Sequence, residues 1–222
     1  MVDDIVLEVV TIANTEQKEV RIGLSHLYQR YFKPFLIALH REQAGLDIKV
    51  VVSDSGYLER LLIERDLDFA LIQHPADTGA FDCIDLKPVQ LVAVAPKSMD
   101  EFSNCTSISM TQLLSREIIM LRRSSGSGTF EALQEQFRKQ GISLNNTLTM
   151  SQPEAILDML ESGMNCVALL PDSEISPSHR TDCHVMKIEQ APLVFFPSIV
   201  KLTSTRFIHD VDRLIRDLED YA

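Results

Sequence analysis

A turn dense in hydroxyl groups and glycines carries the clearest chemical signal in the sequence. It follows an apolar run at residues 118–121 and leads into an amphipathic run that begins at position 129. Glycines let a turn direct its backbone N–H groups inward, hydroxyl groups add donors, and a helix N-terminus adds partial positive charge. Arg122 and Arg123 stand beside the turn and could add full charge. The pattern predicts a site for an anion or a polar ligand, while a flexible turn with a helix cap is the structural alternative. The candidate residues are Ser124, Ser125, Gly126, Ser127, Gly128 and Thr129.

Motifs for catalysis or metal binding are missing from the sequence. The turn lacks the Gly-Lys-[Ser/Thr] ending of a P-loop, and its Gly-Ser-Gly at 126–128 lacks the spacing of a nucleophile elbow. The six histidines are scattered, with no His-Glu-x-x-His pattern and no acidic pair at metal-ligand spacing. We therefore expect no enzymatic activity, no metal and no cofactor.

The four cysteines form no C-x-x-C pair, so we expect them to be reduced and structural. Cys166 lies in an apolar run and is predicted to be buried. A redox role for Cys83, Cys105 or Cys183 has no positive support in the sequence.

Two stretches of the chain repeat a β-α-β-α-β pattern, which is typical of parallel sheets covered by helices. The first spans residues 19–72 and the second spans 118–170. The expected strands are 20–23, 48–52, 69–72, 118–121, 147–150 and 166–170; the expected helices are 28–40, 57–65, 111–115, 129–140 and one between Pro153 and Gly163. The predicted fold class is α/β, with two Rossmann-like lobes.

Two longer apolar stretches, 86–95 and 193–202, lie between these units and are predicted to be crossover strands that join the lobes. Lobe I would contain residues 19–95 plus 199–222, and lobe II residues 96–198. The final stretch, 205–221, has the apolar periodicity of an amphipathic helix.

Ligands of such sheets bind at the carboxyl ends of the strands, which adds six candidate residues. Ser25 and Ser151 would either contact a ligand or cap a helix; Ser151 has the capping-box spacing to Glu154. Three further polar residues lie at the ends of strands and are ligand-contact candidates, with a surface or loop-capping role as the alternative. One aromatic residue would either line the pocket or pack in the core. These are His26, Gln73, His74 and Phe195.

The composition and charge of the chain argue against nucleic acid and membrane as direct binding partners. The 222 residues carry a formal net charge of −11, which argues against binding the phosphate backbone of a nucleic acid alone. No apolar run is long enough for a transmembrane helix, so no membrane partner is expected. The acidic start, Met1 to Asp4, lacks the basic region of a secretory signal and favours the cytoplasm.

Four segments in the expected order resemble the effector-binding domain of LysR-type transcriptional regulators. They are 20–25 (VRIGLS), 67–72 (LDFALI), 89–96 (VQLVAVAP) and 167–171 (VALLP). The resemblance implies a fold like type 2 periplasmic binding proteins and a small effector in the cleft between the lobes, and the local Arg, His and hydroxyl groups favour an anion or a zwitterion. It also implies a homodimer or homotetramer, with contacts through the helix at 28–40 and the strand at 48–52.

The sequence departs from that family in three places. Gly163-Met164-Asn165 keeps one glycine of the usual Gly-x-Gly, and Lys97-Ser98-Met99 replaces the usual His-Pro-Leu. The winged helix-turn-helix is absent before residue 19, so we expect DNA binding only through that missing domain, with residues 1–18 as the tail of its linker helix or an unrelated tail. The alternative function is a solute-binding protein or an enzyme domain of the same two-lobed fold; transport would require export, and catalysis would require a nucleophile, base or metal.

Overall fold

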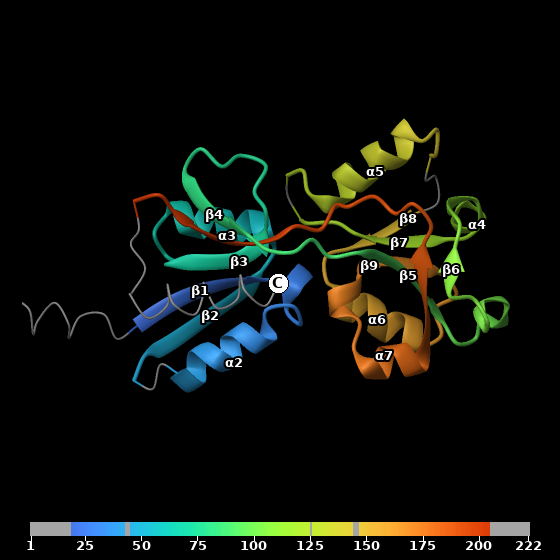
Figure 1. Ribbon diagram of the computed structural model, residues 1–222, viewed down its shortest axis with the longest axis horizontal. Coiled ribbons are helices and arrows are strands. Elements are labelled where there is room, and N and C mark those ends of the chain that lie inside the picture. The colour runs from blue at the N-terminus through green and yellow to red at the C-terminus, as the bar shows by residue number, and fades with distance from the viewer. Residues whose placement is uncertain (1–18, 43–44, 125, 144–146, 205–222) are drawn as a thin grey trace, which may run out of the picture.

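The computed structural model describes residues 19–42, 45–124, 126–143 and 147–204. The predicted tail at 1–18, the predicted helix at 205–221 and the candidate Ser125 lie outside these residues. Within them, the chain forms two mixed β-sheets, each covered by helices on both faces (Figure 1). We call the first sheet with its helices lobe I and the second sheet with its helices lobe II.

Lobe I contains a 5-stranded sheet in the order β2-β1-β3-β11-β4. β1, β2 and β3 pair in parallel, whereas β11 pairs antiparallel with both β3 and β4. In Figure 1, α2 lies on one face of this sheet and α3 on the other. The elements are β1 (Glu19–Ser25), η1 (His26–Tyr28), α2 (Lys33–Glu42), β2 (Asp47–Ser53), α3 (Ser55–Ile63), β3 (Phe69–Gln73), β4 (Phe81–Asp85) and β11 (Pro197–Leu202).

Lobe II contains a 6-stranded sheet in the order β6-β10-β5-β9-β7-β8. β7 pairs in parallel with β8 and β9, and β5 runs antiparallel to β9 and β10. In Figure 1, α5 covers one face, and α6 and α7 cover the other. The elements are β5 (Leu91–Pro96), η2 (Asp100–Phe102), β6 (Ser107–Ile108), α4 (Met110–Leu114), β7 (Ile118–Leu121), α5 (Thr129–Lys139), β8 (Thr147–Met150), α6 (Pro153–Glu161), β9 (Val167–Pro171), η3 (Asp172–Glu174), α7 (Pro177–Asp182) and β10 (Cys183–Ile188).

The backbone passes between the sheets twice, and the two passages are hydrogen-bonded to each other. The Val89 N–H donates to the Phe195 carbonyl at 3.0 Å, and the Leu86 N–H donates to the Pro197 carbonyl at 3.0 Å. The two predicted crossovers are present, but their strands start later than expected: β5 begins at Leu91 rather than at residue 86, and β11 begins at Pro197 rather than at residue 193. Pro88 lacks an N–H and interrupts the first stretch.

The sheets also shift the expected lobe limits by a few residues. β5 belongs to the second sheet although residues up to 95 were expected in lobe I, and β11 brings Pro197 and Ser198 into the first sheet. The folding of each lobe as a domain stays a prediction.

Two helix starts differ from the sequence expectation. The predicted helix at 28–40 begins as the separate turn η1, and α2 starts at Lys33, because Pro34 fits only the first turn of a helix. The interpretation of Ser151 as a helix cap is wrong: the N-cap of α6 is Gln152, with no side-chain capping bond. The expected end of α5 is confirmed, since Gly141 follows the C-cap residue Gln140 with a φ of 75°.

Most apolar side chains of the two sheets are buried, with the valines of β2 as the main exception, and the main cluster continues from lobe I into lobe II through the crossover region. Cys166 is buried as predicted, and all four cysteines are free thiols. Burial raises the pKa of the Cys166 and Cys183 thiols to about 11, so both are unreactive near neutral pH.

A substitution at Gly23 tests the close packing of α3 on the first sheet. A Cβ atom at Gly23 would lie 2.8 Å from Leu67 Cδ1, 3.0 Å from the Ala70 Cβ and 3.1 Å from Leu58 Cδ2. Gly23→Ala should lower the free energy of unfolding by about 1–3 kcal/mol because this core is overpacked by the added methyl group. Urea unfolding measures the change. Gly79→Ala, in an exposed loop, is the control; equal stability of Gly23→Ala and the wild type would contradict the packing described.

Candidate functional site

A small cavity of about 40 Å³ lies between the lobes, where the carboxyl ends of parallel strands from both sheets face each other. Lobe I contributes the residues that end β1 and β3 and the turn after β2; lobe II contributes the residues that follow β7 and β8 and the start of α5. The lining residues are Ser25, His26, Leu27, Asp54, Ser55, Gln73, Leu121, Arg122, Arg123, Gly128, Thr129 and Ser151. Since one water occupies roughly 10–15 Å³ of such a volume, this form of the cavity has room for only a few waters.

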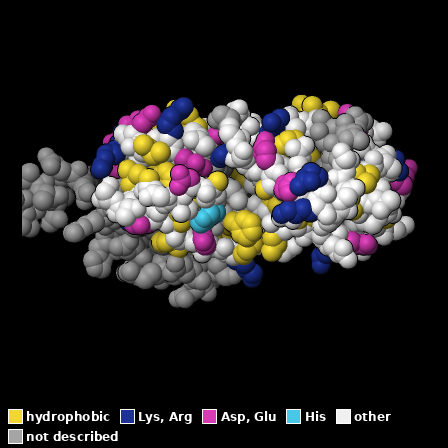
Figure 2. Space-filling view, turned by 90° about the horizontal axis from the view of Figure 1, so that it is seen from above, with side chains coloured by type: hydrophobic (Ala, Val, Ile, Leu, Met, Phe, Trp, Pro, Cys, Tyr) yellow, Lys and Arg dark blue, Asp and Glu magenta, His cyan; other side chains and the backbone are white. Residues whose placement is uncertain are grey.

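Six of the predicted site residues therefore meet at one cavity, and five others among the described residues do not line it. Those that meet are Ser25, His26, Gln73, Gly128, Thr129 and Ser151. Ser124, Gly126, Ser127, His74 and Phe195 are not among the lining residues. Figure 2 shows the narrowing between the two lobes, with acidic and basic side chains close together on both sides of it.

Ser25 both caps a turn and faces the cavity. Its hydroxyl is almost completely buried and accepts hydrogen bonds from the Leu27 N–H at 3.3 Å and from the Ser55 hydroxyl at 3.1 Å. Ser55 Oγ accepts in turn from the Gln73 N–H at 3.4 Å. This chain of hydroxyl groups joins the ends of β1 and β3 and leaves the Ser25 hydroxyl hydrogen as a donor for a ligand.

Two polar contacts cross the rim of the cavity from lobe II to lobe I. The Ser124 hydroxyl donates to Asp54 Oδ2, and Asp54 Oδ1 accepts from the Tyr57 N–H at 3.0 Å as the N-cap of α3. Arg123 Nη1 lies 3.5 Å from Glu59 Oε1, and both side chains are mostly buried. The rim is thus closed by one hydroxyl–carboxylate bond and one ion pair.

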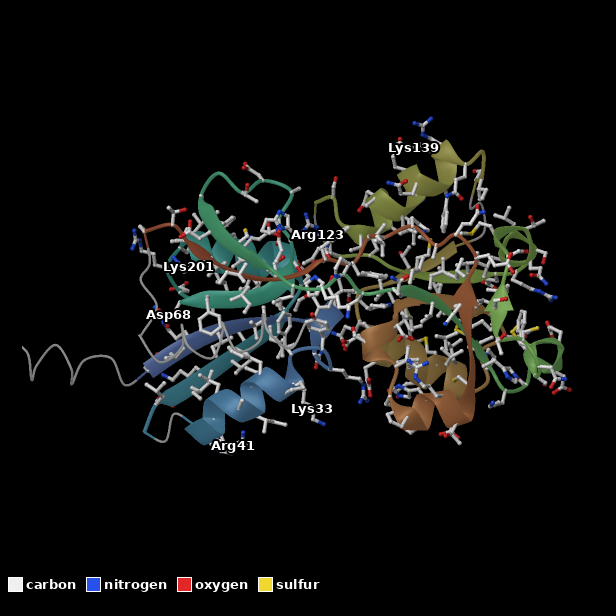
Figure 3. All side chains as sticks on the ribbon, in the orientation of Figure 1. Lys33, Arg41, Asp68, Arg123, Lys139 and Lys201 are labelled. Carbon is white, nitrogen blue, oxygen red and sulfur yellow. The ribbon has the colours of Figure 1, made fainter. Side chains whose placement is uncertain are left out.

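The glycines of the predicted turn make room for Arg123. A Cβ at Gly128 would lie 3.1 Å from Arg123 Cδ, one at Gly126 would lie 3.1 Å from Nη2, and one at Gly56 in lobe I would lie 3.4 Å from Nη1. Gly126 also has a φ of 72°, which favours glycine. Figure 3 places Arg123 at the boundary between the lobes. The Nε atom of Arg123 is buried and has no hydrogen-bond partner among the described residues.

His26 brings a neutral ring to the cavity. Partial burial lowers its pKa, and the nearby Asp54 carboxylate only partly opposes that effect. Near neutral pH, the lowered pKa favours a neutral His26 ring over a cationic one as the partner of a ligand.

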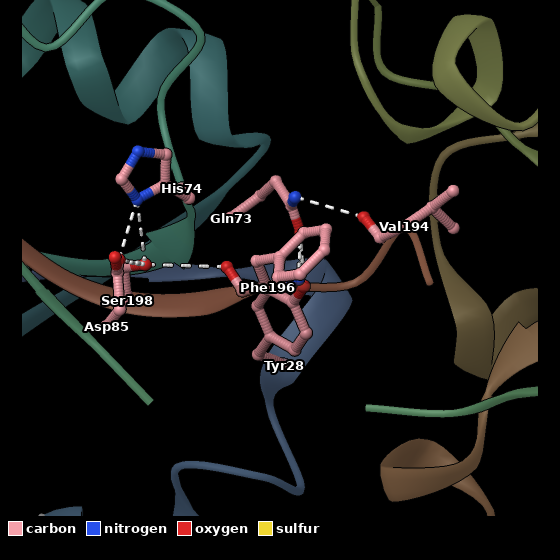
Figure 4. A network of polar contacts seen from close by, with 7 residues as sticks. All are labelled: Tyr28, Gln73, His74, Asp85, Val194, Phe196 and Ser198. Carbon is pink, nitrogen blue, oxygen red and sulfur yellow. Dashed lines mark hydrogen bonds and ion pairs between the residues drawn. The ribbon is translucent and has the colours of Figure 1, made fainter. Parts of the chain in front are cut away.

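Gln73 connects the cavity to the crossover segments (Figure 4). Its Nε2 donates to the Val194 carbonyl at 3.1 Å, and its Oε1 accepts from the Phe196 N–H at 3.0 Å and from the Tyr28 hydroxyl. Burial raises the pKa of Tyr28 well above its ordinary value, which keeps the phenol protonated as the donor. The hydrogen bonds of the Gln73 amide are therefore used by the crossover segments, which we call the hinge, even though the residue lines the cavity.

His74 and Phe195 have structural surroundings. His74 Nδ1 contacts Asp85 Oδ1 at 2.6 Å on the lobe I side of the hinge (Figure 4). The Phe195 side chain is buried in the main apolar cluster, in keeping with core packing as the alternative.

Sequence reasoning missed a further contact between the lobes, made by Glu174 of η3. Its carboxylate accepts from the Arg30 N–H at 3.0 Å and the Tyr31 N–H at 3.2 Å in lobe I, and from the Ser173 hydroxyl at 3.2 Å. Burial raises the pKa of Glu174, although these hydrogen bonds oppose the shift. The available signal was an acidic residue in the turn after an apolar strand: Glu174 is the third residue after β9, and Asp54 directly follows β2.

No group of three or more His, Cys, Asp or Glu side chains in the described ranges is arranged to hold a metal ion. In the same part of the chain, no helix has the length and apolar character needed to span a lipid bilayer.

Residues 13–197 match the protein family described as the LysR substrate binding domain, and the chain belongs to this family. It is 24% identical over 135 residues to the RuBisCO operon transcriptional regulator of Allochromatium vinosum, covering 60% of this chain and 44% of that protein. The chain thus spans less than half the length of this curated relative.

Solved structures show the same fold at low sequence identity. The BenM effector-binding domain with its effector benzoate has a TM-score of 0.74 and 15% identity, covering 91% of this chain and 92% of that chain. The Synechocystis PCC6803 CcmR regulatory domain in complex with 2-PG has a TM-score of 0.73 and 15% identity, covering 91% and 96%. The predicted two-lobed α/β fold and the family resemblance are confirmed.

The pH dependence of stability tests the Glu174 contact. Because the folded pKa of Glu174 is raised, the folded protein binds more protons than the unfolded chain between the unfolded pKa, about 4.3, and the folded value. The contribution of Glu174 to stability should therefore fall as pH rises through that window, by at most about 1.4 kcal/mol per pH unit.

Glu174→Gln should remove this slope, so the difference in unfolding free energy between wild type and variant should change with pH from 4 to 7. Glu64→Gln, at an exposed position after α3, is the control. A constant difference across this range for Glu174→Gln would contradict the assignment.

Proposed function

We propose that this domain is the effector-binding part of a LysR-type transcriptional regulator and that it binds a small anionic metabolite between its lobes. The observation that carries the proposal is the position of Arg123. This residue lines a cavity built from strand ends of both lobes, and its buried Nε has no partner among the described residues. A guanidinium with unused donors favours a carboxylate or a phosphate.

The neighbouring groups suit such a ligand. Ser25, Thr129 and Ser151 add hydroxyl groups to the lining, and Arg122 adds a guanidinium whose Nε pairs with Glu131 Oε1 at 3.2 Å. The N-terminus of α5, at Thr129, contributes partial positive charge that is shared with the Glu131 carboxylate, which accepts from the Gly128 N–H at 2.8 Å. BenM and CcmR, which share this fold, were solved with benzoate and with 2-PG respectively, and benzoate carries a carboxylate.

A change in the angle between the lobes would couple binding to regulation. The cavity of about 40 Å³ is too small for a metabolite of several heavy atoms, so the rim contacts have to separate to admit one. A ligand that binds the separated form more tightly would shift the domain toward it. Contact with DNA would be made by a separate domain, since the net charge of −11 opposes binding of this domain to a phosphate backbone. The regulator would act in the cytoplasm.

The alternative of an enzyme domain of the same fold gains no support from the cluster of Ser198, His74 and Asp85 beside the crossover segments. Ser198 is fully buried and donates to Asp85 Oδ1 at 2.7 Å. His74 uses the same Nδ1 atom toward Asp85 at 2.6 Å and toward Ser198 at 3.5 Å. A catalytic triad needs the two ring nitrogens of the histidine to face different partners.

We also propose that the domain forms a homodimer, or a homotetramer in the full-length protein, through α2 and the edge strand β2. β2 pairs only with β1 within the described sheet and carries three valines, Val50, Val51 and Val52, that are about 40% exposed. Ile37 on α2 is 54% exposed. An edge strand with apolar side chains is suited to association with another chain.

Substitution of Arg123 tests the ligand site. Arg123→Gln should weaken binding of benzoate, 2-phosphoglycolate and inorganic phosphate by about 10- to 100-fold, since a hydrogen bond to a charged group contributes about 1.5–3 kcal/mol. Isothermal titration calorimetry on the folded domain gives the affinities. Arg138→Gln, at an exposed position on α5, is the control. If no anion binds the wild type, or if Arg123→Gln binds as well as the wild type, the anion site is ruled out.

Substitution on β2 tests the oligomer. Val51→Lys should raise the dissociation constant of the dimer at least about tenfold, because a lysine on an edge strand opposes strand-to-strand association. Analytical ultracentrifugation over a concentration series measures it. Ile63→Lys, an equally apolar exposed position on α3, should leave the constant unchanged. A wild-type domain that stays monomeric at high concentration would refute this interface.

A further inference from the structure

The ion pair across the rim occupies the same guanidinium that the proposed ligand needs. Arg123 belongs to the segment after β7 in lobe II, and Glu59 lies on α3 in lobe I. Their closest atoms, Nη1 and Oε1, are 3.5 Å apart, which is the outer limit of a hydrogen bond. Arg123 lines the cavity, whereas Glu59 does not. The guanidinium therefore stands between an internal carboxylate and the space for a ligand.

The contact with Arg123 partly buries the Glu59 carboxylate, which is unfavourable for its charged form. Its side chain is 23% exposed, and burial raises its pKa even though Arg123 pulls in the opposite direction; the Asp54 carboxylate nearby adds to the rise. The pair thus compensates only part of the desolvation of the carboxylate, as expected for a long contact between partly buried charges. An anion that binds the Arg123 guanidinium with shorter hydrogen bonds can therefore replace Glu59 as its partner.

The glycines around Arg123 permit that exchange. Gly56 of lobe I and Gly126 and Gly128 of lobe II all border the guanidinium, at distances where a Cβ would meet it at 3.1–3.4 Å. Without side chains at these positions, the guanidinium can turn from Glu59 toward the cavity. In the orientation toward the cavity, the buried Nε atom, which has no partner among the described residues, could donate a hydrogen bond to a ligand.

Building on the proposed function, we propose that Glu59 is an internal competitor for Arg123. A carboxylate or phosphate group of the effector displaces the Glu59 carboxylate from the guanidinium, and this displacement breaks the ion pair that closes the rim. Glu59 thereby makes a negative charge on the ligand a condition for entry. A neutral molecule of the same shape would have to break the rim contact without replacing it.

Replacement of Glu59 by glutamine tests the competition. Glu59→Gln should bind benzoate, 2-phosphoglycolate and inorganic phosphate about three- to tenfold more tightly than the wild type, the range expected for release of a partly exposed ion pair. Benzamide, the neutral counterpart of benzoate, should show no such gain. Glu64→Gln removes the same charge at the exposed end of α3 and should leave all affinities within about twofold. If Glu59→Gln does not fold, Glu59→Asp, which shortens the contact arm, should give a smaller gain in the same direction.

A double variant identifies the route. In an Arg123→Gln background, Glu59→Gln should no longer increase anion affinity, because the competition acts through the guanidinium. Failure of every anion to bind any variant would refute the proposed function itself. Anion binding to the wild type with no gain in Glu59→Gln, or with an equal gain in Glu64→Gln, would overturn the competitor role of Glu59 and leave the anion site standing.

Discussion

Two adjacent backbone passages between the sheets are the constraint on which the rest of the structure depends. Within residues 19–204 the chain leaves lobe I before β5 and returns before β11, and the passages are joined by the Val89–Phe195 and Leu86–Pro197 hydrogen bonds. Gln73 ties the returning passage to Tyr28. A paired, clamped connection fixes one edge of the gap between the lobes, so the remaining freedom is a change in their angle.

The polar contacts between the lobes can be replaced by contacts with a ligand, so a ligand can shift the equilibrium between two lobe angles. Glu174 reaches the backbone N–H groups of Arg30 and Tyr31, while Arg123 and Ser124 reach Glu59 and Asp54. Each contact pairs a carboxylate from one lobe with a donor from the other, and burial opposes the charged form of Glu174 and of Glu59. Their net contribution is therefore small, and a ligand with modest differential affinity can tip the balance between two lobe angles.

Much of the site followed from strand order along the sequence, because the carboxyl ends of parallel strands align without any knowledge of distant contacts. This rule placed Ser25, Gln73 and Ser151 around one cavity. What it could not supply was the partner of each group. The glycines at 126 and 128 were expected to expose amides to a ligand, and instead they accommodate Arg123. The Gln73 amide was expected to face the ligand, but it bonds to residues more than 120 positions away. Local spacing shows which groups can meet, whereas long-range packing decides which are already satisfied.

A crystal structure of the domain grown with 2-phosphoglycolate tests the central claim most directly. The account predicts an anionic group of the ligand within hydrogen-bond distance of the Arg123 guanidinium, Glu59 displaced from Nη1, and the two lobes rotated relative to each other about the paired passages. A saturated complex with the Arg123–Glu59 pair intact and the ligand bound outside the gap between the lobes would contradict it.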